Sequence, residues 1–215
     1  MRDRYEEQLV QLNTELLKMG TLCESAISCA VKYLTDDDPK LRENVIETEH
    51  QIDRMERSIE SLCMKLLIHQ QPVASDFRVV TSALKMISDM ERIGDQAEDI
   101  SEIAEYVNSS GLCSEVSIKE MAKTAVLMVM NSIDSFVRND ENIARDVIDL
   151  DDTMDLLFAD VKKQVTEAVR TGSADAESIV DMLMIAKYFE RIGDHAENIA
   201  EWVIFAITGS HDNKQ

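Results

Sequence analysis

Apolar residues recur at helical spacing along nearly the whole chain. Long stretches rich in Leu, Met, Ala, Glu and Lys place an apolar side chain every three or four residues, which is typical of helices with one buried face. Only 6 glycines and 2 prolines interrupt the 215 residues. The clearest apolar seam consists of Val79, Ala83, Met86, Met90, Ile93, Ala97, Ile100, Ala104 and Val107. The pattern predicts an all-α protein with these methionines in its core.

Turn and capping residues divide the first half of this pattern into three long helices. The first helix is expected over residues 5–34. Asp38 can cap a second helix over residues 39–69, whose proline at the first position needs no hydrogen-bond donor. Ser75 is expected to cap a third helix that ends near Val107.

The second half repeats this layout after a short polar segment. The stretch "NSSGLCS", residues 108–114, reads as a linker. Ser117, three residues before a glutamate, has the spacing of a capping box and should open the fourth helix. Asn139 is expected to cap the fifth helix, and Gly172 should end it before a sixth begins. Six long helices with short turns are therefore predicted.

The two halves also match in sequence. Glu-Arg-Ile-Gly-Asp occurs at residues 91–95 and again 99 residues later at 190–194, and the identities continue beyond each copy. "VIETEHQID" at Val45 aligns with "VIDLDDTMD" at Val147, and the small difference in offset falls in an expected loop. This is an internal duplication. It predicts two tandem homologous antiparallel three-helix bundles, residues 1–110 and 111–215.

Charge and composition exclude several classes of function. The chain has 22 basic and 42 acidic residues, a formal net charge of −20, and no basic face, so it should repel nucleic acid. No apolar run is long enough to span a membrane, and no charged-then-apolar leader begins the chain. The protein is therefore expected to be cytoplasmic and at most peripheral to a membrane.

The cysteines form no C-x-x-C pair and sit among aliphatic residues. They are Cys23, Cys29, Cys63 and Cys113. Reduced thiols packed in the core are expected, rather than disulfide or zinc chemistry.

Acidic residues form stripes beside the apolar seam. Residues three or four apart share one face of a helix, so the acids of the third and sixth helices should each line up, as should those of the second and fifth. The candidate metal ligands are Glu49, Asp53, Glu91, Asp95, Glu98, Asp151, Asp155, Glu190, Asp194 and Glu197. Gly94 and Gly193 recur at the same point and imply close approach of a neighbouring helix or a ligand. A solvated acidic face is the alternative, but clustered carboxylates beside a core favour a hard cation.

The second half is poorer in acids. Phe158 and Lys162 replace two glutamates that the second helix carries, so two metal sites would differ in ligand number and affinity. His195 points about 100° away from its stripe and is expected to be a polar neighbour rather than a ligand. Arg92 and Arg191 follow stripe acids directly and are expected to orient those carboxylates through ion pairs.

The stretches "QPVASDFRVVTSALKMISDMERIGDQAEDI" and "IVDMLMIAKYFERIGDHAENIAEWV" resemble the PhoU family of phosphate-signalling regulators over nearly the whole chain. The tandem Glu/Asp-x-x-x-Asp motifs that carry the resemblance are Glu49 with Asp53, Glu91 with Asp95, Asp151 with Asp155, and Glu190 with Asp194. The first copy departs from the second at Asp99 and Ser101.

The resemblance implies multinuclear metal clusters, of iron or zinc, bound by these motifs. It also implies a negative regulator of the phosphate-starvation response. Such a regulator is an adaptor rather than an enzyme, and links the ATPase subunit of a phosphate ABC transporter to a sensor histidine kinase. An unpaired apolar seam on the first or fourth helix would allow a homodimer.

Three other functions are compatible with the same residues. A ferritin-like di-iron enzyme needs Glu-x-x-His twice, and only Glu47 with His50 has that spacing. An all-α, metal-dependent nucleotide pyrophosphohydrolase would need an enclosed pocket with basic or aromatic contacts near the acids. A metal-free acidic helical docking module would bind a basic partner in a salt-sensitive way.

Overall fold

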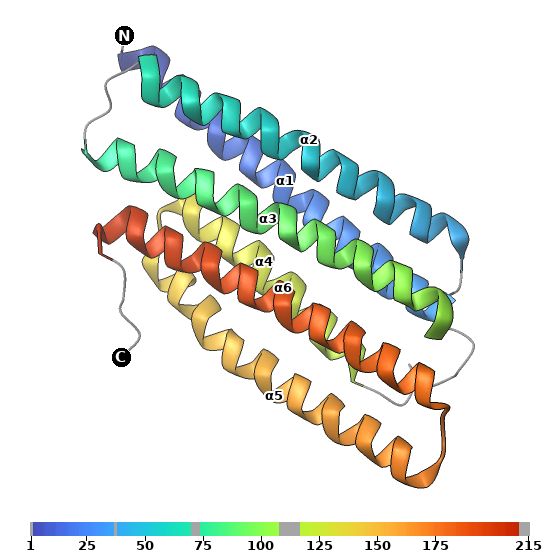
Figure 1. The fold of residues 1–215 in the computed structure, drawn as a ribbon. Helices are drawn as coiled ribbons and strands as arrows, with labels where there is room; N and C mark the ends of the chain where they lie inside the picture. Colours follow the sequence, from blue (N-terminus) through green and yellow to red (C-terminus); the bar gives the residue numbers. More distant parts are fainter. Residues whose placement is uncertain (1, 37, 70–73, 108–116, 211–215) are drawn as a thin grey trace.

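The computed structural model describes residues 2–36, 38–69, 74–107 and 117–210, and those residues form helices without a strand (Figure 1). The helices are α1 (Arg2–Asp36), α2 (Pro39–His69), α3 (Ala74–Val107), α4 (Ile118–Arg138), α5 (Glu141–Thr171) and α6 (Ala176–Thr208). The all-α prediction with six long helices is confirmed. The predicted linker at 108–114 lies outside the described residues. None of the helices within the described ranges combines the length and apolarity that a membrane crossing requires.

Two of the predicted helix ends are confirmed by their hydrogen bonds. The backbone N–H of Lys40 donates to Asp38 Oδ1 over 3.1 Å, so Asp38 caps α2 as expected. Gly172 closes α5 in the left-handed conformation, with φ of 66°. Such a backbone is strained for residues with a Cβ, which is why glycine serves there.

Other predicted ends are shifted by one or two residues. Asn139 closes α4 with φ of 53° instead of capping α5, and Asp140 caps α5 by accepting from two backbone N–H groups. α6 is capped by Asp175. α3 already begins at Ala74, so Ser75 lies inside its first turn. Asn and Asp compete for the same short turns, and sequence alone does not rank them.

Ser117 starts α4 without the expected capping box, because its side chain makes no cap hydrogen bond. Instead, the side chain of Gln164 on the neighbouring helix α5 hydrogen-bonds to both the backbone and the side chain of Ser117. The Ser117 N–H donates to Gln164 Oε1, and Gln164 Nε2 donates to Ser117 Oγ, each over 3.0 Å. A tertiary contact has replaced a local one.

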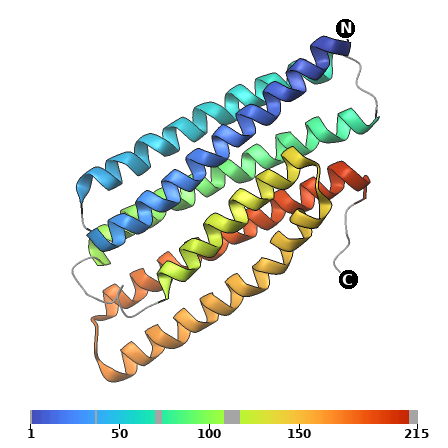
Figure 2. The same cartoon turned by 180° about the vertical axis from the view of Figure 1, so that it is seen from behind.

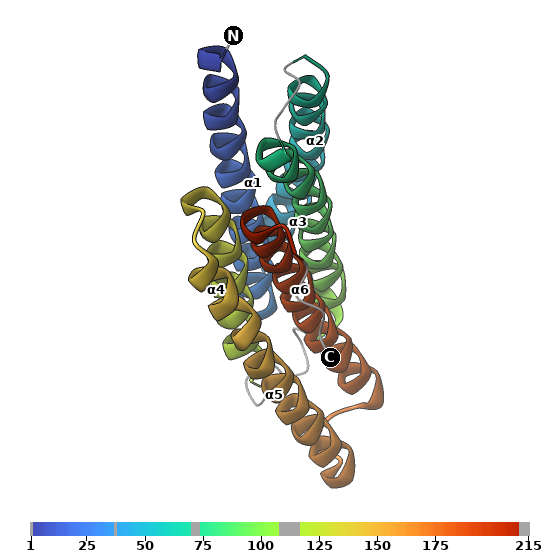
Figure 3. The same ribbon diagram turned by 90° about the vertical axis from the view of Figure 1, so that its left-hand side faces the viewer.

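Each half is an antiparallel three-helix bundle, and the halves pack along two helix pairs. α3 and α6 share the most extensive interface in the molecule, and α1 also contacts α4 (Figures 1 and 2). α2 and α5 lie at opposite edges of the molecule, and α1, α3, α4 and α6 lie between them (Figures 1 and 3). One apolar core therefore runs through both halves.

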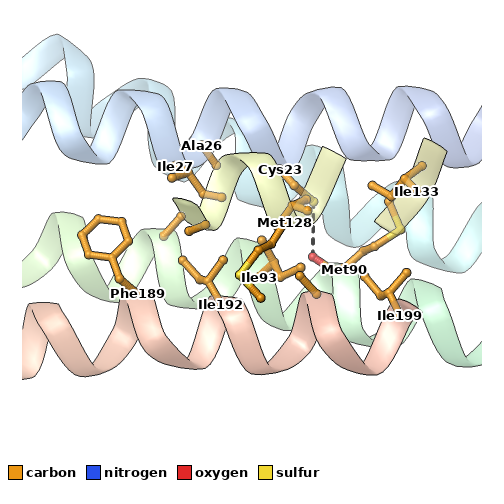
Figure 4. Packing of buried hydrophobic residues seen from close by; sticks show 14 of the residues in the cluster. Cys23, Ala26, Ile27, Met90, Ile93, Met128, Ile133, Phe189, Ile192 and Ile199 are labelled. Carbon is orange, nitrogen blue, oxygen red and sulfur yellow. Dashed lines mark hydrogen bonds between the residues drawn. The ribbon is translucent and has the colours of Figure 1, made fainter. Parts of the chain in front are cut away.

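The middle of this core is built from all four inner helices (Figure 4). Met90 and Ile93 of α3 are fully buried, as the seam predicted, and Ile192 of α6 is fully buried as well. Fully buried side chains of this size each stabilise the fold by roughly 1.5–3 kcal/mol.

The cysteines that the structure describes are free thiols. The Cys23 thiol donates to the Met90 carbonyl over 3.5 Å, a contact drawn in Figure 4. Burial raises the pKa of Cys23 and of Cys63 to about 12. Cys29 is half-buried. The prediction of reduced core cysteines is confirmed for Cys23 and Cys63, while Cys113 lies outside the described residues.

Candidate functional site

The two repeated glycines bring the outer helices against the central pair. A Cβ on Gly94 would lie 3.0 Å from Cδ1 of Ile52 on α2. A Cβ on Gly193 would lie 3.2 Å from Cγ of Met154 on α5 and 3.6 Å from Oδ1 of Asp151. A neighbouring helix, rather than a ligand, therefore accounts for the close approach. The acids of each helix pair are placed side by side as a consequence.

The first acidic face consists of Glu49 and Asp53 on α2 and Glu91, Asp95 and Glu98 on α3. Glu49 is only 9% exposed, and the other four are half-buried. Carboxylates that lose hydration in this way are harder to ionise, and each neighbouring negative charge adds to the effect.

Electrostatic coupling shows that the acids of α2 and α3 face each other across the helix pair. Loss of hydration, then Asp95, raises the pKa of Glu91, and Glu56 and Asp53 on α2 raise it further. Glu56 also accepts a hydrogen bond from Ser88 of α3 over 3.3 Å. Glu56 therefore belongs to this surface although it was absent from the candidate ligands.

A second coupling lies further along the same pair of helices. Loss of hydration, then the charge of Glu49 on α2, raises the pKa of Glu98. Glu102 raises it further, whereas His50 lowers it. The predicted facing of the two stripes is confirmed for this half.

Basic side chains compensate part of the first acidic face. Arg57 Nη2 pairs with Asp53 at 2.6 Å, and Arg92 Nη1 pairs with Asp95 at 2.8 Å. His50 Nδ1 lies 2.6 Å from Glu49 Oε2. The expected orienting role of Arg92 is confirmed. Arg57, four residues after Asp53, was signalled by the ion-pair spacing of a helix but was not among the predicted residues.

The second acidic face consists of Asp151 and Asp155 on α5 and Glu190, Asp194 and Glu197 on α6. Asp155 and Asp194 are exposed, whereas the other three are half-buried. Partial loss of hydration, then Glu190, raises the pKa of Asp194, although its carboxylate still touches water. This face is more open than the first.

Basic residues close one end of the second face. Lys187 pairs with Glu190. The ammonium groups of Lys162 and Lys187 each lie 5.6 Å from the ring centroid of Phe158. These contacts place positive charge where the first half has glutamates, so the predicted asymmetry between the halves has a structural basis.

The two halves also meet through polar contacts between α3 and α6. His195 Nδ1 lies 2.9 Å from Asp89 Oδ1, and Asn198 donates to the same oxygen over 3.4 Å. His195 is thus a polar neighbour, as predicted, but its partner belongs to the other half. The pKa of Asp99 on α3 is raised, first by loss of hydration and then by neighbouring acids. The charge of Arg191 on α6 opposes this rise. No sequence signal pointed to Asp89, because it depends on how α3 packs against α6.

The side-chain arrangement does not itself form a metal centre. Within the described ranges, no group of three or more His, Cys, Asp or Glu side chains is gathered so that it could hold a metal ion. The donors of both faces are carboxylate oxygens, which suit hard cations. Several of them are turned toward Arg57, Arg92 and Lys187 instead. A cation would have to compete with these partners.

Comparison with known proteins gives a consistent result. The PhoU domain model matches this chain twice, at residues 16–104 and 118–203. The phosphate-specific transport system accessory protein PhoU homolog of Pseudomonas aeruginosa is 32% identical over 96% of this chain and 86% of its own length. The homolog of Clostridium acetobutylicum is 31% identical over 97% of this chain and 96% of its own length.

Solved structures share the whole architecture. The crystal structure of PhoU from Pseudomonas aeruginosa has a TM-score of 0.86 at 31% identity, covering 96% of this chain and all of that one. The phosphate transport system regulatory protein PhoU from Streptococcus pneumoniae, at 23% identity, has the same fold with a TM-score of 0.87, covering 97% of this chain and 99% of that one. With the duplicated domain and the full-length similarity together, this chain belongs to the PhoU family.

Proposed function

We propose that this protein is a regulatory accessory protein of a phosphate-specific transport system and restrains the phosphate-starvation response when phosphate is plentiful. The duplicated acidic face, repeated at matching positions of two PhoU domains, is the observation that carries the proposal. Relatives of nearly the same length are named accessory proteins of that system, which supports a regulatory rather than an enzymatic role.

Metal binding at the two acidic faces is the second part of the proposal. Glu49, Asp53, Glu91, Asp95 and Glu98 would hold cations on the first face, and the five acids of the second face would hold fewer or weaker ones. Iron or zinc is expected from the family. The raised pKa values of Glu91 and Glu98 support the proposal, because they reflect loss of hydration first and then repulsion between carboxylates, and a bound cation would offset both.

Metal binding would require the carboxylates to leave their present partners. Arg57 pairs with Asp53 and Arg92 pairs with Asp95, and in both pairs the arginine side chain is exposed to solvent. Such exposed ion pairs contribute only about 0–1 kcal/mol each to stability. Turning Asp53 and Asp95 away from them is therefore inexpensive compared with coordination of a multivalent cation. The basic partners hold the face in place and do not forbid the site.

An adaptor role in the cytoplasm completes the proposal, with the transporter's ATPase subunit and a sensor histidine kinase as partners. A nucleotide pyrophosphohydrolase would need an enclosed pocket beside the acids. Two pockets of about 590 and 140 Å³ are lined by none of the acids of either face. This observation favours the regulator over the hydrolase.

The test is an affinity pull-down from cells grown with and without phosphate. Wild type is compared with a first double variant that combines Asp95→Asn with Asp194→Asn. The control is a second double variant, Glu43→Gln with Asp146→Asn, which changes two exposed acids outside both faces. We expect transporter or kinase components to be recovered with wild type and the control, and to be reduced in the first variant. Recovery of neither component in either condition would refute the adaptor role. Phosphate release from nucleotides that depends on Asp95 would favour the hydrolase.

A further inference from the structure

A pocket of about 590 Å³ lies between α1 and α4. Figure 2 shows these two helices on the side of the molecule that faces the viewer. Its apolar lining consists of Ile27, Val31, Ala122, Val126, Leu127 and Met130. Leu127 is 48% exposed, whereas Ile27 and Ala122 of the same lining belong to the buried core. None of the acids of either face lines the pocket.

The pocket arises from the way α1 crosses α4. A Cβ on Gly20 would lie 2.5 Å from Ile133 Cδ1, so the helices are in close contact there. The pocket opens on one side of this contact, where the short side chains of Ser28 and Ala122 leave the space unfilled. A separate pocket of about 140 Å³ is lined by residues of α1, α3, α4 and α6, among them Leu9 and Phe136.

Positive charge is concentrated around this pocket. Lys32 of α1 and Lys119 and Lys123 of α4 contribute to its lining, and all three are exposed. Lys123 pairs with Glu120 at 2.8 Å, an exposed pair of little energetic value. Three lysines around one apolar pocket contrast with the net charge of −20 of the whole chain. An occupant that carries negative charge next to apolar groups would match both properties.

We propose that this pocket, which forms a groove between α1 and α4, binds an acidic amphipathic helix of a partner protein. The partner helix would place its apolar face against Val126, Leu127 and Val31 and its acidic residues near the lysines. The part of α4 from Lys119 to Met130 spans about three helical turns, which matches the anchor spacing i, i+3 or i+4, and i+7 of a helix lying in a groove.

A second copy of this chain fits the groove less well. A two-fold contact through this surface would bring the lysines of both copies together, because such interfaces use the same patch twice. A head-to-tail contact, with an acidic face of one copy on the groove of the next, would give rings or open chains of molecules. The charge of the groove therefore favours a different, acidic partner.

The test measures binding of a fluorescently labelled synthetic peptide of about 14 residues, long enough for roughly four turns, with leucine on one face and glutamate on the other. A matched peptide carries lysine in place of glutamate. We expect saturable, salt-sensitive binding of the glutamate peptide, measured by fluorescence anisotropy. The Lys119→Glu and Leu127→Asp variants should each weaken it about tenfold or more.

Matched controls separate the groove from general surface effects. Lys163→Glu and Leu156→Asp change an exposed lysine and an exposed leucine on α5 and should leave binding unchanged. Circular dichroism checks that each variant is folded. Equal losses in groove and control variants, or no saturable binding of the glutamate peptide, would overturn the proposal. Displacement of the peptide by dodecanoate at a Leu127-dependent site would identify a small anionic amphiphile instead.

Sedimentation of the free protein completes the experiment. Self-association that Leu127→Asp abolishes would assign the groove to a second copy and would overturn the proposal. Both acidic faces are intact in all of these variants, so the outcome is independent of metal binding and of the regulatory role proposed above.

Discussion

The tight contact between Gly94 and Ile52 gives a quantitative test of how α2 and α3 are held together. Gly94→Ala should gain about 1 kcal/mol in helix propensity. The new Cβ would lie 3.0 Å from Ile52 Cδ1, and overpacking of this kind typically costs about 1–3 kcal/mol. The net effect is a destabilisation of about 0–2 kcal/mol, so the single variant should have a free energy of unfolding equal to that of wild type or lower by up to about 2 kcal/mol.

Removing the Ile52 methyl group that causes the clash should allow the helix-propensity gain of Gly94→Ala to be measured. Ile52→Val deletes Cδ1 and alone should cost about 0.5–1.5 kcal/mol, because Ile52 is 1% exposed. In the double variant the nearest remaining atoms, Cγ2 and Cβ of residue 52, lie 3.4 and 3.6 Å from the new Cβ, which is ordinary contact. The two substitutions should therefore be coupled favourably by about 1 kcal/mol.

Urea denaturation followed by circular dichroism measures this coupling in a double-mutant cycle. A parallel cycle of Gly94→Ala with Ile204→Val serves as control and should be additive, because Ile204 is a buried residue of α6 near the start of α3, where Arg78 Nε donates to the Ala206 carbonyl. A coupling between residues 94 and 52 below about 0.3 kcal/mol would refute the reasoning, because it is within the additivity error expected for independent sites. It would show that glycine at this position does not serve the approach of α2.

Three further predictions concern charge, thiols and helix ends. The pKa values of Glu91 and Glu98 are raised in the folded state above the ordinary glutamate value of 4.5, so the folded state binds protons more tightly than the unfolded chain. The melting temperature should therefore rise as the pH falls from 7 to about 5. Replacing both with glutamine should flatten that rise; an unchanged slope would contradict the coupling. Cys23 and Cys63, with pKa values of about 12, should react with a thiol reagent only after urea unfolds the protein. Asp140→Ala removes two cap hydrogen bonds from α5 and should lower the free energy of unfolding by about 0.5–2 kcal/mol, whereas Asp140→Asn should lose much less.

Sequence periodicity was sufficient to predict the fold because each helix carries its own buried face. The spacing of Met86, Met90 and Ile93 identified a core seam that the structure places at 0% exposure. That Asp140 rather than Asn139 caps α5 could not be predicted, since both residue types suit that position. Helix ends depend on one or two hydrogen bonds, whereas helix faces depend on many side chains.

The candidate site shows the same division between local and tertiary information. The acidic stripes and the glycine next to each are local features, and the facing of the stripes across α2 and α3 followed from placing both helices in one bundle. The hydrogen bond between His195 and Asp89 joins residues 106 positions apart, and the lysine-lined groove joins α1 to α4. Neither is visible before the packing of one half against the other is known.

The proposal that the acidic faces bind metal is tested most directly by the metal content per chain. Three proteins are compared: wild type, the double variant that combines Asp95→Asn with Asp194→Asn, and a control double variant that combines Glu43→Gln with Asp146→Asn. Each is dialysed into metal-free buffer, reloaded with iron or zinc, washed, and measured by elemental analysis. We predict several tightly held equivalents in wild type and control, and a clear loss in the first variant while its helical circular dichroism signal persists. Equal metal content in all three proteins, or retained metal in none, would contradict the assignment of these carboxylates as ligands.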